Sequence, residues 1–184
     1  LRPTRPTFSP GFRVTLAPAS EDFYVLDPQV RRIALELSGS SAGMFDALCQ
    51  NLRRIVALRR VLAEQRPAVA VAMMSTPNVL LAFASLGIGE MSAIGSERCY
   101  PPHAPLGRLW AALCRRMYGR LDAVVALTQE CASWIRLNSN AVRAPVIPNA
   151  VSWPLPLHPP MLAFGSVCPP ERKVLLAVGR LEAV

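Results

Sequence analysis

The segment that decides the fold spans residues 67–97 and reads PAVAVAMMSTPNVLLAFASLGIGEMSAIGSE. Its first 23 residues, 67–89, carry no charge. That length meets the roughly 20 residues that a membrane-spanning helix needs. Two interpretations therefore compete for this segment: a membrane span, or a buried strand followed by a buried helix.

The internal order of the segment favours the strand and the helix. Residues 69–73 form a short apolar run that is typical of a strand. The hydroxyl residues Ser75 and Thr76 suit a helix cap, and Pro77 suits the first helical position. A buried helix then continues and ends at Gly87. A membrane span leaves the polar turn in the middle of the segment unexplained.

The rest of the chain repeats this alternation of short apolar strands and amphipathic helices. Strands that are covered on both faces lose their polar–apolar alternation, and strands that alternate with helices form parallel sheets. The predicted fold class is therefore α/β, with a Rossmann-like, doubly wound parallel sheet. The expected strands are 13–17, 32–37, 69–73, 91–95, 122–127 and 146–147, and the expected helices are 38–66, 78–86, 106–120 and one that Thr128 caps.

Two of the expected helices carry apolar stripes, which predict the faces that they bury. In the expected helix 106–120, Arg108 and Arg115 lie opposite the stripe. The stripe of helix 38–66 consists of Leu48, Leu52, Ile55, Leu58 and Leu62, and that of helix 106–120 consists of Leu106, Trp110, Leu113, Met117 and Leu121.

The composition predicts one globular domain, a linker and the start of another domain. The chain has 184 residues, of which 18 are proline, and it is 52% hydrophobic and 17% charged. It is therefore too apolar for disorder and too rich in proline for a helical bundle. Six further prolines follow Pro148 up to residue 170, which is typical of a linker. We expect a domain over 1–149, a proline-rich interdomain linker over 150–172 and the first strand of a second domain over 173–184. The chain starts at Leu1 and stops within a pattern, so we expect a fragment of a longer protein.

The net charge of +8 is almost entirely due to arginine. The first 120 residues hold 15 arginines against 8 acidic residues. A basic surface of this kind suits acidic partners, such as an anionic membrane surface or a phosphorylated substrate. Nucleic acid is not an expected partner, because the arginines are not interleaved with aromatic residues and no nucleic-acid-binding motif is present. A solvated surface without a partner is the alternative.

The cysteine pattern predicts neither a metal site nor a disulfide framework. The five cysteines are odd in number and form no C-x-x-C pair, and His103 and His158 stand in no metal-ligand spacing. Free thiols in a reducing compartment are the simplest account. We therefore expect a cytoplasmic protein without a bound metal.

Polar side chains follow the predicted strands, at the ends where ligands bind in an open parallel sheet. Arginine supplies a fork of donors to phosphate oxygens, and helix N-termini add backbone donors. The sequence therefore predicts a polar crevice that suits a sugar and a phosphate. Its candidate residues are Ser75, Asn78, Glu97, Arg98 and Thr128, together with Gly179 and Arg180 after a further strand at 173–178.

Three blocks of sequence, taken in order, carry a resemblance. The first is Glu97-Arg98 after a short strand, followed by a helix that leads to residues 118–128, YGRLDAVVALT. The second is residues 146–151, VIPNAV, and the third is residues 176–181, LAVGRL. Together they resemble the family 4 glycosyltransferases of GT-B fold.

The resemblance implies that the first domain is the N-terminal half of a GT-B fold. In the family this domain binds the acceptor, often a lipid-linked sugar at the cytoplasmic face of the membrane. A second domain binds the nucleotide-sugar donor, and the transfer retains the anomeric configuration, typically without a metal. By this resemblance Ser75, Asn78, Glu97, Arg98 and Thr128 belong to the acceptor side of the cleft.

The resemblance also assigns residues near the C-terminus. Gly179 and Arg180 match the block that contacts the donor diphosphate, and Pro148 and Asn149 form the interdomain hinge. No residue is identified as catalytic. Many relatives carry a histidine near the site where this chain has Glu97 and its neighbours, and the chain lacks the pair of glutamates, eight residues apart, of the family's donor domain.

The resemblance leads us to expect a glycosyltransferase that acts on a lipid-linked or polysaccharide acceptor in cell-surface glycan synthesis. It would lie on the inner face of the cell membrane, and the fragment alone would be inactive. The alternative is a non-catalytic basic module that associates with a membrane. At the level of residues, Glu97 and Arg98 could be a surface pair in a turn, Asn78 could serve only the turn at Pro77, and Asn149 could brace its own turn through backbone hydrogen bonds.

Overall fold

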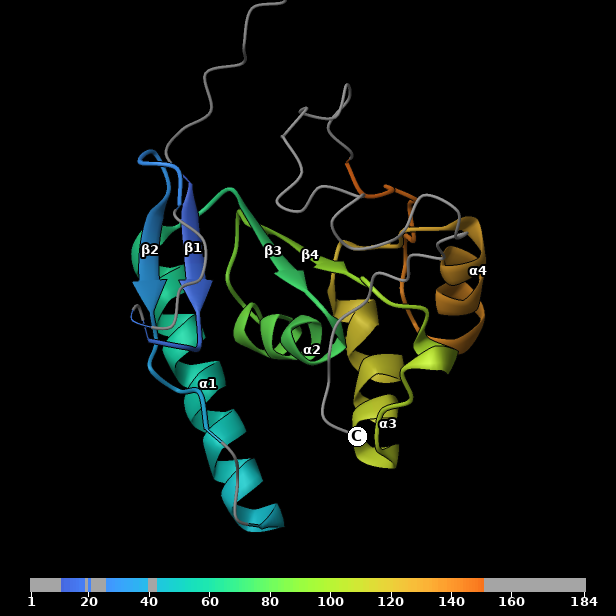
Figure 1. Cartoon of the computed structure of the whole chain (residues 1–184), viewed down its shortest axis with the longest axis horizontal. Coiled ribbons are helices and arrows are strands. Elements are labelled where there is room, and N and C mark those ends of the chain that lie inside the picture. The colour runs from blue at the N-terminus through green and yellow to red at the C-terminus, as the bar shows by residue number, and fades with distance from the viewer. Residues whose placement is uncertain (1–10, 19, 21–25, 40–42, 151–184) are drawn as a thin grey trace, which may run out of the picture. The chain divides into compact units, whose positions relative to one another are not determined.

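The computed structural model describes residues 11–18, 20, 26–39 and 43–150 (Figure 1). The chain divides into two compact units, Leu1–Asn149 and Ala150–Val184. Nearly all of the expected linker and second-domain strand lies outside the described residues, and so do Gly179 and Arg180.

Five strands and four α-helices alternate along the described part of the chain. The expected order is confirmed as far as the helix that Thr128 caps, although most elements are a few residues shorter than expected. Of the expected strand 146–147, only a single bridge at Val146 forms. Short 3-10 turns at Pro101–His103 and Tyr118–Arg120 flank the third helix. The elements are β1 (Phe12–Thr15), β2 (Arg31–Ala34), α1 (Met44–Gln65), β3 (Val69–Met73), α2 (Ser75–Ala84), β4 (Ser92–Ser96), α3 (Arg108–Met117), β5 (Ala123–Val125) and α4 (Gln129–Asn138).

All strand pairs are parallel, as the α/β class requires. β3, β4 and β5 form one sheet in that order, in which Val71 lies opposite Ile94. A parallel bridge from Ala126 to Val146 extends this sheet beyond β5. β1 and β2 form a second parallel pair, and within the described residues no bridge joins this pair to β3. The Rossmann-like α/β fold is confirmed.

The turn between β3 and α2 is tighter than the sequence suggested. α2 starts at Ser75, with Met74 in the N-cap position at a φ of 79° and without a side-chain cap. The expected hydroxyl cap is wrong, because the Ser75 hydroxyl is hydrogen-bonded to Glu97 instead. Pro77 is the third helical residue and not the first. It fits there because the first N–H groups of a helix have no intrahelical acceptor.

The competing membrane interpretation of residues 67–89 is wrong for this segment. It folds as β3, a turn and α2, which has 10 residues and ends at Ala84 before reaching the expected Gly87. Among the residues that the structure describes, no helix combines the length and the apolar character that crossing a membrane demands.

The hydrophobic core lies between α2, the β3–β5 sheet and parts of the other helices. Val79, Val124 and Ile135 are among its fully buried side chains. The predicted stripe of this helix is confirmed from Trp110 onward, since Met117 and Leu121 are buried and Trp110 and Leu113 pack against the core. Its first member is wrong: Leu106 lies before α3 and is exposed.

The predicted stripe of α1 is confirmed only in its second half. Ile55, Leu58 and Leu62 contact the core. Leu48 and Leu52 are 57% and 53% exposed, so burial of the first half is wrong within the described residues. The reason is that the C-terminal half of the helix is the part that reaches the buried core.

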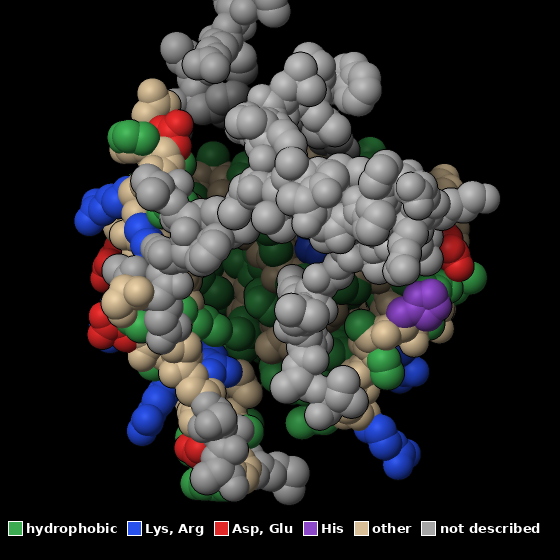
Figure 2. All heavy atoms as spheres, viewed as in Figure 1, with side chains coloured by type: hydrophobic (Ala, Val, Ile, Leu, Met, Phe, Trp, Pro, Cys, Tyr) green, Lys and Arg blue, Asp and Glu red, His purple; other side chains and the backbone are tan. Residues whose placement is uncertain are grey.

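β3 is covered on one face only. Ala70 and Ala72 pack against the core, whereas Val69, Val71 and Met73 are 50%, 56% and 58% exposed. Figure 2 shows hydrophobic side chains gathered over this part of the molecule. The expectation that both faces of the apolar strand are covered is wrong for the described residues, because α2 covers one face and no described element covers the other.

Close packing between β4 and α2 requires a glycine at position 95. A Cβ atom there would lie 2.9 Å from Leu121 Cδ1 and 3.1 Å from the side-chain Cγ of Asn78. Both neighbours are buried, and hydrogen bonds hold Asn78 in place. The absence of a side chain at Gly95 therefore sets the distance between the helix and the sheet.

We expect Gly95→Ala to lower the free energy of unfolding by about 1–3 kcal/mol, the usual cost of overpacking a core. Urea unfolding followed by circular dichroism would measure the change. Gly89→Ala is the matched control, because a Cβ at Gly89 meets nothing within 4 Å. The control should change the free energy by no more than about 0.5 kcal/mol. Equal effects of the two substitutions would contradict the role of Gly95.

Candidate functional site

Glu97, the residue directly after β4, is the centre of a buried polar cluster. It is 2% exposed, and its backbone N–H donates to the carbonyl oxygen of Val125 in β5 (2.8 Å). Its carboxylate accepts three hydrogen bonds. The Ser75 hydroxyl donates to Oε2 (3.0 Å), Asn78 Nδ2 donates to Oε1 (3.4 Å), and the Tyr118 hydroxyl also donates to Oε1. A buried carboxylate is costly unless it is hydrogen-bonded, and these three donors supply that compensation.

Asn78 joins the helix to the sheet. Its side chain is fully buried, and its Oδ1 accepts a hydrogen bond from the Ser96 N–H of β4 (3.1 Å). Its Nδ2 donates to Glu97 from the same amide group. The alternatives that Asn78 serves only the Pro77 turn and that Glu97 is a surface residue are therefore wrong.

Tyr118 belongs to the cluster but was not among the predicted site residues. It lies after α3, next to the apolar stripe, and is buried. A signal was present in the sequence, because a buried tyrosine needs a hydrogen-bond partner for its hydroxyl. Burial, followed by the negative charge of Glu97, raises the pKa of Tyr118 far above its ordinary value of 10.0. The hydroxyl therefore stays protonated and remains a donor.

Cys114 closes the cluster from α3. Its Sγ donates to the backbone carbonyl of Ser75 at 4.0 Å, a distance typical of weak sulfur hydrogen bonds. Burial raises the pKa of this thiol, so it stays in the uncharged form. Cys114 thus fills the space beside the start of α2 without adding a second negative charge near Glu97.

Arg98 is the residue of this strand end that reaches toward solvent. It is partly exposed, and its guanidinium donates to Oδ1 of Asn149. Asn149 follows the bridge at Val146, so this contact joins the end of β4 to the last described residues of the first unit. The contact uses the side chain of Asn149 and does not depend on its backbone. Pro148 lies beside it and is exposed.

Thr128 acts as the N-cap of α4. Its side chain accepts a hydrogen bond from the Cys131 N–H (3.2 Å), which confirms the predicted cap. Thr128 is exposed, and no hydrogen bond in the described part of the chain joins it to Glu97. The structure therefore brings Ser75, Asn78 and Glu97 together and places Thr128 outside that hydrogen-bonded group.

The cluster holds the end of β4 in position, and Arg98 beside it is partly exposed. Both carboxylate oxygens of Glu97 already accept hydrogen bonds, and the side chain is closed to solvent. Glu97 therefore fixes the end of β4, from which Arg98 projects. Across residues 11–18, 20, 26–39 and 43–150, no three His, Cys, Asp or Glu side chains come together in a group that could hold a metal ion.

Parallel strands, helices between them and a polar cluster at the strand carboxyl ends define a Rossmann-like α/β domain. The sequence profile described as Glycosyl transferase 4-like domain matches residues 9–150. The chain belongs to this family, which confirms the resemblance to family 4 glycosyltransferases. No curated protein matches the chain.

Tyr118→Phe should lower the free energy of unfolding by about 1–3 kcal/mol near neutral pH, because Glu97 loses a donor. The variant should also lose part of the pH dependence above pH 10. There the unfolded wild-type chain releases the Tyr118 proton while the native state keeps it, so the stability of the wild type falls as the pH rises.

Urea unfolding of both proteins from about pH 8 to about pH 11 would test this, since that range spans the ordinary tyrosine pKa. The stability difference between the two proteins should shrink toward the alkaline end. If the free energies of unfolding of the two proteins changed in parallel with pH, burial would not raise the pKa of Tyr118.

Proposed function

We propose that this chain is the acceptor-binding half of a retaining glycosyltransferase. The enzyme would take a sugar from a nucleotide-sugar donor and transfer it to a lipid-linked or polysaccharide acceptor in cell-surface glycan synthesis. One observation carries the proposal: in a chain of the Glycosyl transferase 4-like family, the buried Glu97 cluster fixes Arg98 at the carboxyl end of β4. This is the end of a parallel sheet at which ligands bind.

Arg98 suits a phosphate of a lipid-linked acceptor. A guanidinium presents five N–H donors in a planar fork, and the described contact with Asn149 uses one of its terminal nitrogens. The remaining donors can pair with phosphate oxygens. Glu97 acts as a positioning residue because its carboxylate is committed to Ser75, Asn78 and Tyr118.

We place the donor diphosphate on Gly179 and Arg180, which match the family's donor block, and we propose that transfer needs no metal. Pro148 and Asn149 would form the hinge between the two halves. Of the donor site the chain then holds only this one block. A single arginine–phosphate contact supports at most roughly millimolar binding.

We therefore expect the chain to bind UDP- and GDP-sugars with a dissociation constant of about 1 mM or weaker, and to show no transferase activity. A short-chain polyprenyl diphosphate sugar should bind at least about tenfold more tightly, a difference of about 1.4 kcal/mol. Isothermal titration calorimetry would measure both. Micromolar binding of a nucleotide sugar would show that the donor site lies in the first domain.

The control for this titration is a pair of arginine substitutions. Arg98→Ala should abolish the preference for the polyprenyl diphosphate sugar, whereas Arg60→Ala, at an exposed position of α1, should leave it unchanged. If Arg98→Ala bound both ligands as the wild type does, Arg98 would have no role in acceptor binding.

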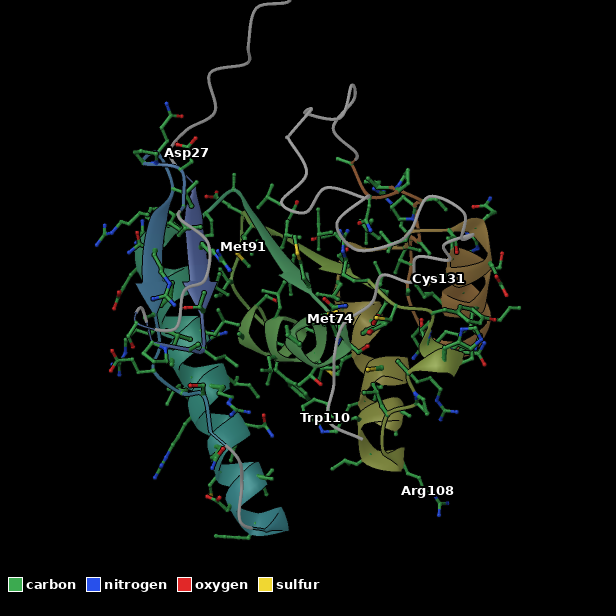
Figure 3. All side chains as sticks on the ribbon, viewed as in Figure 1. Asp27, Met74, Met91, Arg108, Trp110 and Cys131 are labelled. Atoms are coloured by element: carbon green, nitrogen blue, oxygen red, sulfur yellow. The ribbon has the colours of Figure 1, made fainter. Side chains whose placement is uncertain are left out.

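We also propose that α3 docks the domain on the anionic inner face of the cell membrane. Arg108, Arg115 and Arg116 of this helix and Arg120 after it are exposed, and no described acidic side chain forms a salt bridge with them. Figure 3 shows Arg108 at the outer end of α3, pointing away from the domain. Arg116 lines two surface hollows of about 450 and 530 Å³, and no acidic residue lines either one.

The double substitution Arg108→Glu with Arg115→Glu should weaken binding to vesicles of anionic phospholipid by at least about tenfold, because each basic residue near such a surface contributes on the order of 1 kcal/mol. Co-sedimentation with vesicles at moderate salt would measure it. Arg53→Glu with Arg60→Glu, at two exposed positions of α1, is the control of equal charge and should bind more tightly than the α3 variant. Equal losses would assign binding to net charge alone.

Strong vesicle binding without acceptor binding would favour a non-catalytic membrane-associated module.

A further inference from the structure

The two surface hollows beside α3 lie far along the sheet from the candidate site. Arg116 and Asn140 line both of them, and their volumes are about 450 and 530 Å³. Ligand pockets typically measure roughly 300–1,000 Å³. Arg120 precedes β5, whereas Arg98 follows the parallel strand β4, so the hollows and Arg98 are at opposite ends of these strands.

Backbone contacts hold the walls of the hollows in place. The Asn140 N–H donates to the carbonyl oxygen of Arg115 (2.8 Å). Gly119 also lies close to this segment, because a Cβ atom at Gly119 would be 2.8 Å from the carbonyl oxygen of Asn140. The segment after α4 is therefore fixed against the end of α3. A ligand would meet walls that are already formed, which lowers the cost of ordering them.

Three arginine side chains at these walls have no described partner. Arg115, Arg116 and Arg120 are exposed, and in the part of the chain that the structure describes no hydrogen bond or ion pair uses their guanidinium groups. No acidic residue lines either hollow. The C-terminal end of α3 contributes only about half a negative charge. Three full positive charges outweigh it, and a bound anion would relieve their mutual repulsion.

Phosphate is the anion that this arrangement fits best. Guanidinium groups present planar forks of donors that match phosphate oxygens. A phosphomonoester carries a charge of about −1.5 to −2 near pH 7, so one such group neutralises most of the charge of three arginines. The exposed side-chain amide of Asn140, which makes no hydrogen bond within the described residues, adds a neutral donor.

The larger hollow also has an apolar wall that a bare phosphate ion would leave uncovered. Phe83, Leu86 and Met117 line it beside Arg116. Leu86 is 43% exposed, so this wall is open to solvent. Removing apolar surface from water favours binding. The ligand should therefore carry an apolar group next to its phosphate.

We infer that the hollows bind a phosphomonoester whose ester group is apolar. The three arginines hold the phosphate, and Phe83 and Leu86 contact the carbon part. The inference deepens the proposed docking of α3, and it rests on that proposal only for the source of the phosphate. If α3 docks on a membrane, the phosphate belongs to a lipid headgroup; otherwise it belongs to a soluble phosphomonoester.

Titration of the chain with phenyl phosphate, followed by nuclear magnetic resonance of the backbone amides, tests the site in solution. The dissociation constant should be about 1 mM or lower. Inorganic phosphate should bind at least about threefold more weakly, because it covers no apolar surface. The amide signals of Gly119, Arg120 and Asn140 should shift. A shift at Arg98 without any shift at these three residues would overturn the inference.

Arg116→Gln with Arg120→Gln should weaken phenyl phosphate binding by at least about tenfold, because both substitutions remove charge-assisted hydrogen bonds. Arg53→Gln with Arg60→Gln removes the same charge from two exposed positions of α1 and should change the affinity by less than about twofold, because salt screens distant charges. Equal losses in the two variants would show attraction by net charge and would overturn the site.

Asn140→Asp provides a second test at an exposed position. It keeps the backbone N–H that bonds Arg115 and adds a negative charge to both hollows, so it should weaken binding by at least about tenfold. Asn138→Asp adds the same charge at the end of α4, outside both hollows, and should have less effect. Equal effects would contradict a phosphate bound beside Asn140.

Vesicles distinguish the two sources of the phosphate. If the ligand is a lipid headgroup, vesicles with phosphatidic acid should bind the chain at least about threefold more tightly than phosphatidylglycerol vesicles of equal total charge. Phenyl phosphate should then displace the chain from them. Equal binding to both vesicles, with phenyl phosphate binding intact, would support the soluble source. Failure of phenyl phosphate to bind, together with equal vesicle binding, would overturn the site and leave the proposed docking of α3 standing.

Discussion

The hydrogen bonds to the carboxylate of Glu97 are the interaction on which the rest of the domain depends. They come from the start of α2, from its buried Asn78 and from Tyr118 after α3. A buried carboxylate without donors would cost several kcal/mol, so each of these elements must keep its place for the charge to be tolerated. Glu97 therefore joins two helices to the end of β4, and Gly95 two residues earlier allows α2 to come close enough.

This constraint explains how a small domain can present a charged group at a fixed place. The side chain of Arg98 starts directly after a backbone segment that the Glu97 cluster and the β4–β5 hydrogen bonds hold in place. Preorganisation of this kind lowers the cost of ordering a long side chain when a ligand binds. Arg98 is a candidate ligand-binding residue because it lies at the carboxyl ends of the strands in a chain of the Glycosyl transferase 4-like family.

Among the described residues, β3 is uncovered on the side that faces away from β4. The site and the core lie on the side that α2 and α3 cover, whereas the edge of β3 and one of its faces are open among the described residues. A strand that is apolar throughout is typical of the middle of a parallel sheet and costs stability at an exposed edge. The apolar composition of β3 and the exposure of Val69, Val71 and Met73 among the described residues thus conflict.

The sequence by itself determined the order and type of the elements, the parallel sheet and the Thr128 cap, because these follow from local hydrophobic periodicity and capping chemistry. It also placed Ser75, Asn78 and Glu97 at strand ends. Only the tertiary structure decided that their side chains meet on one buried carboxylate, that Tyr118 joins them, and that Ser75 serves Glu97 instead of capping its own helix. The exposed face of β3 and the exposed half of the α1 stripe were equally hidden from sequence reasoning. The physical reason is the same in each case: periodicity shows which side chains can be buried, but the contacts between distant segments decide which ones are.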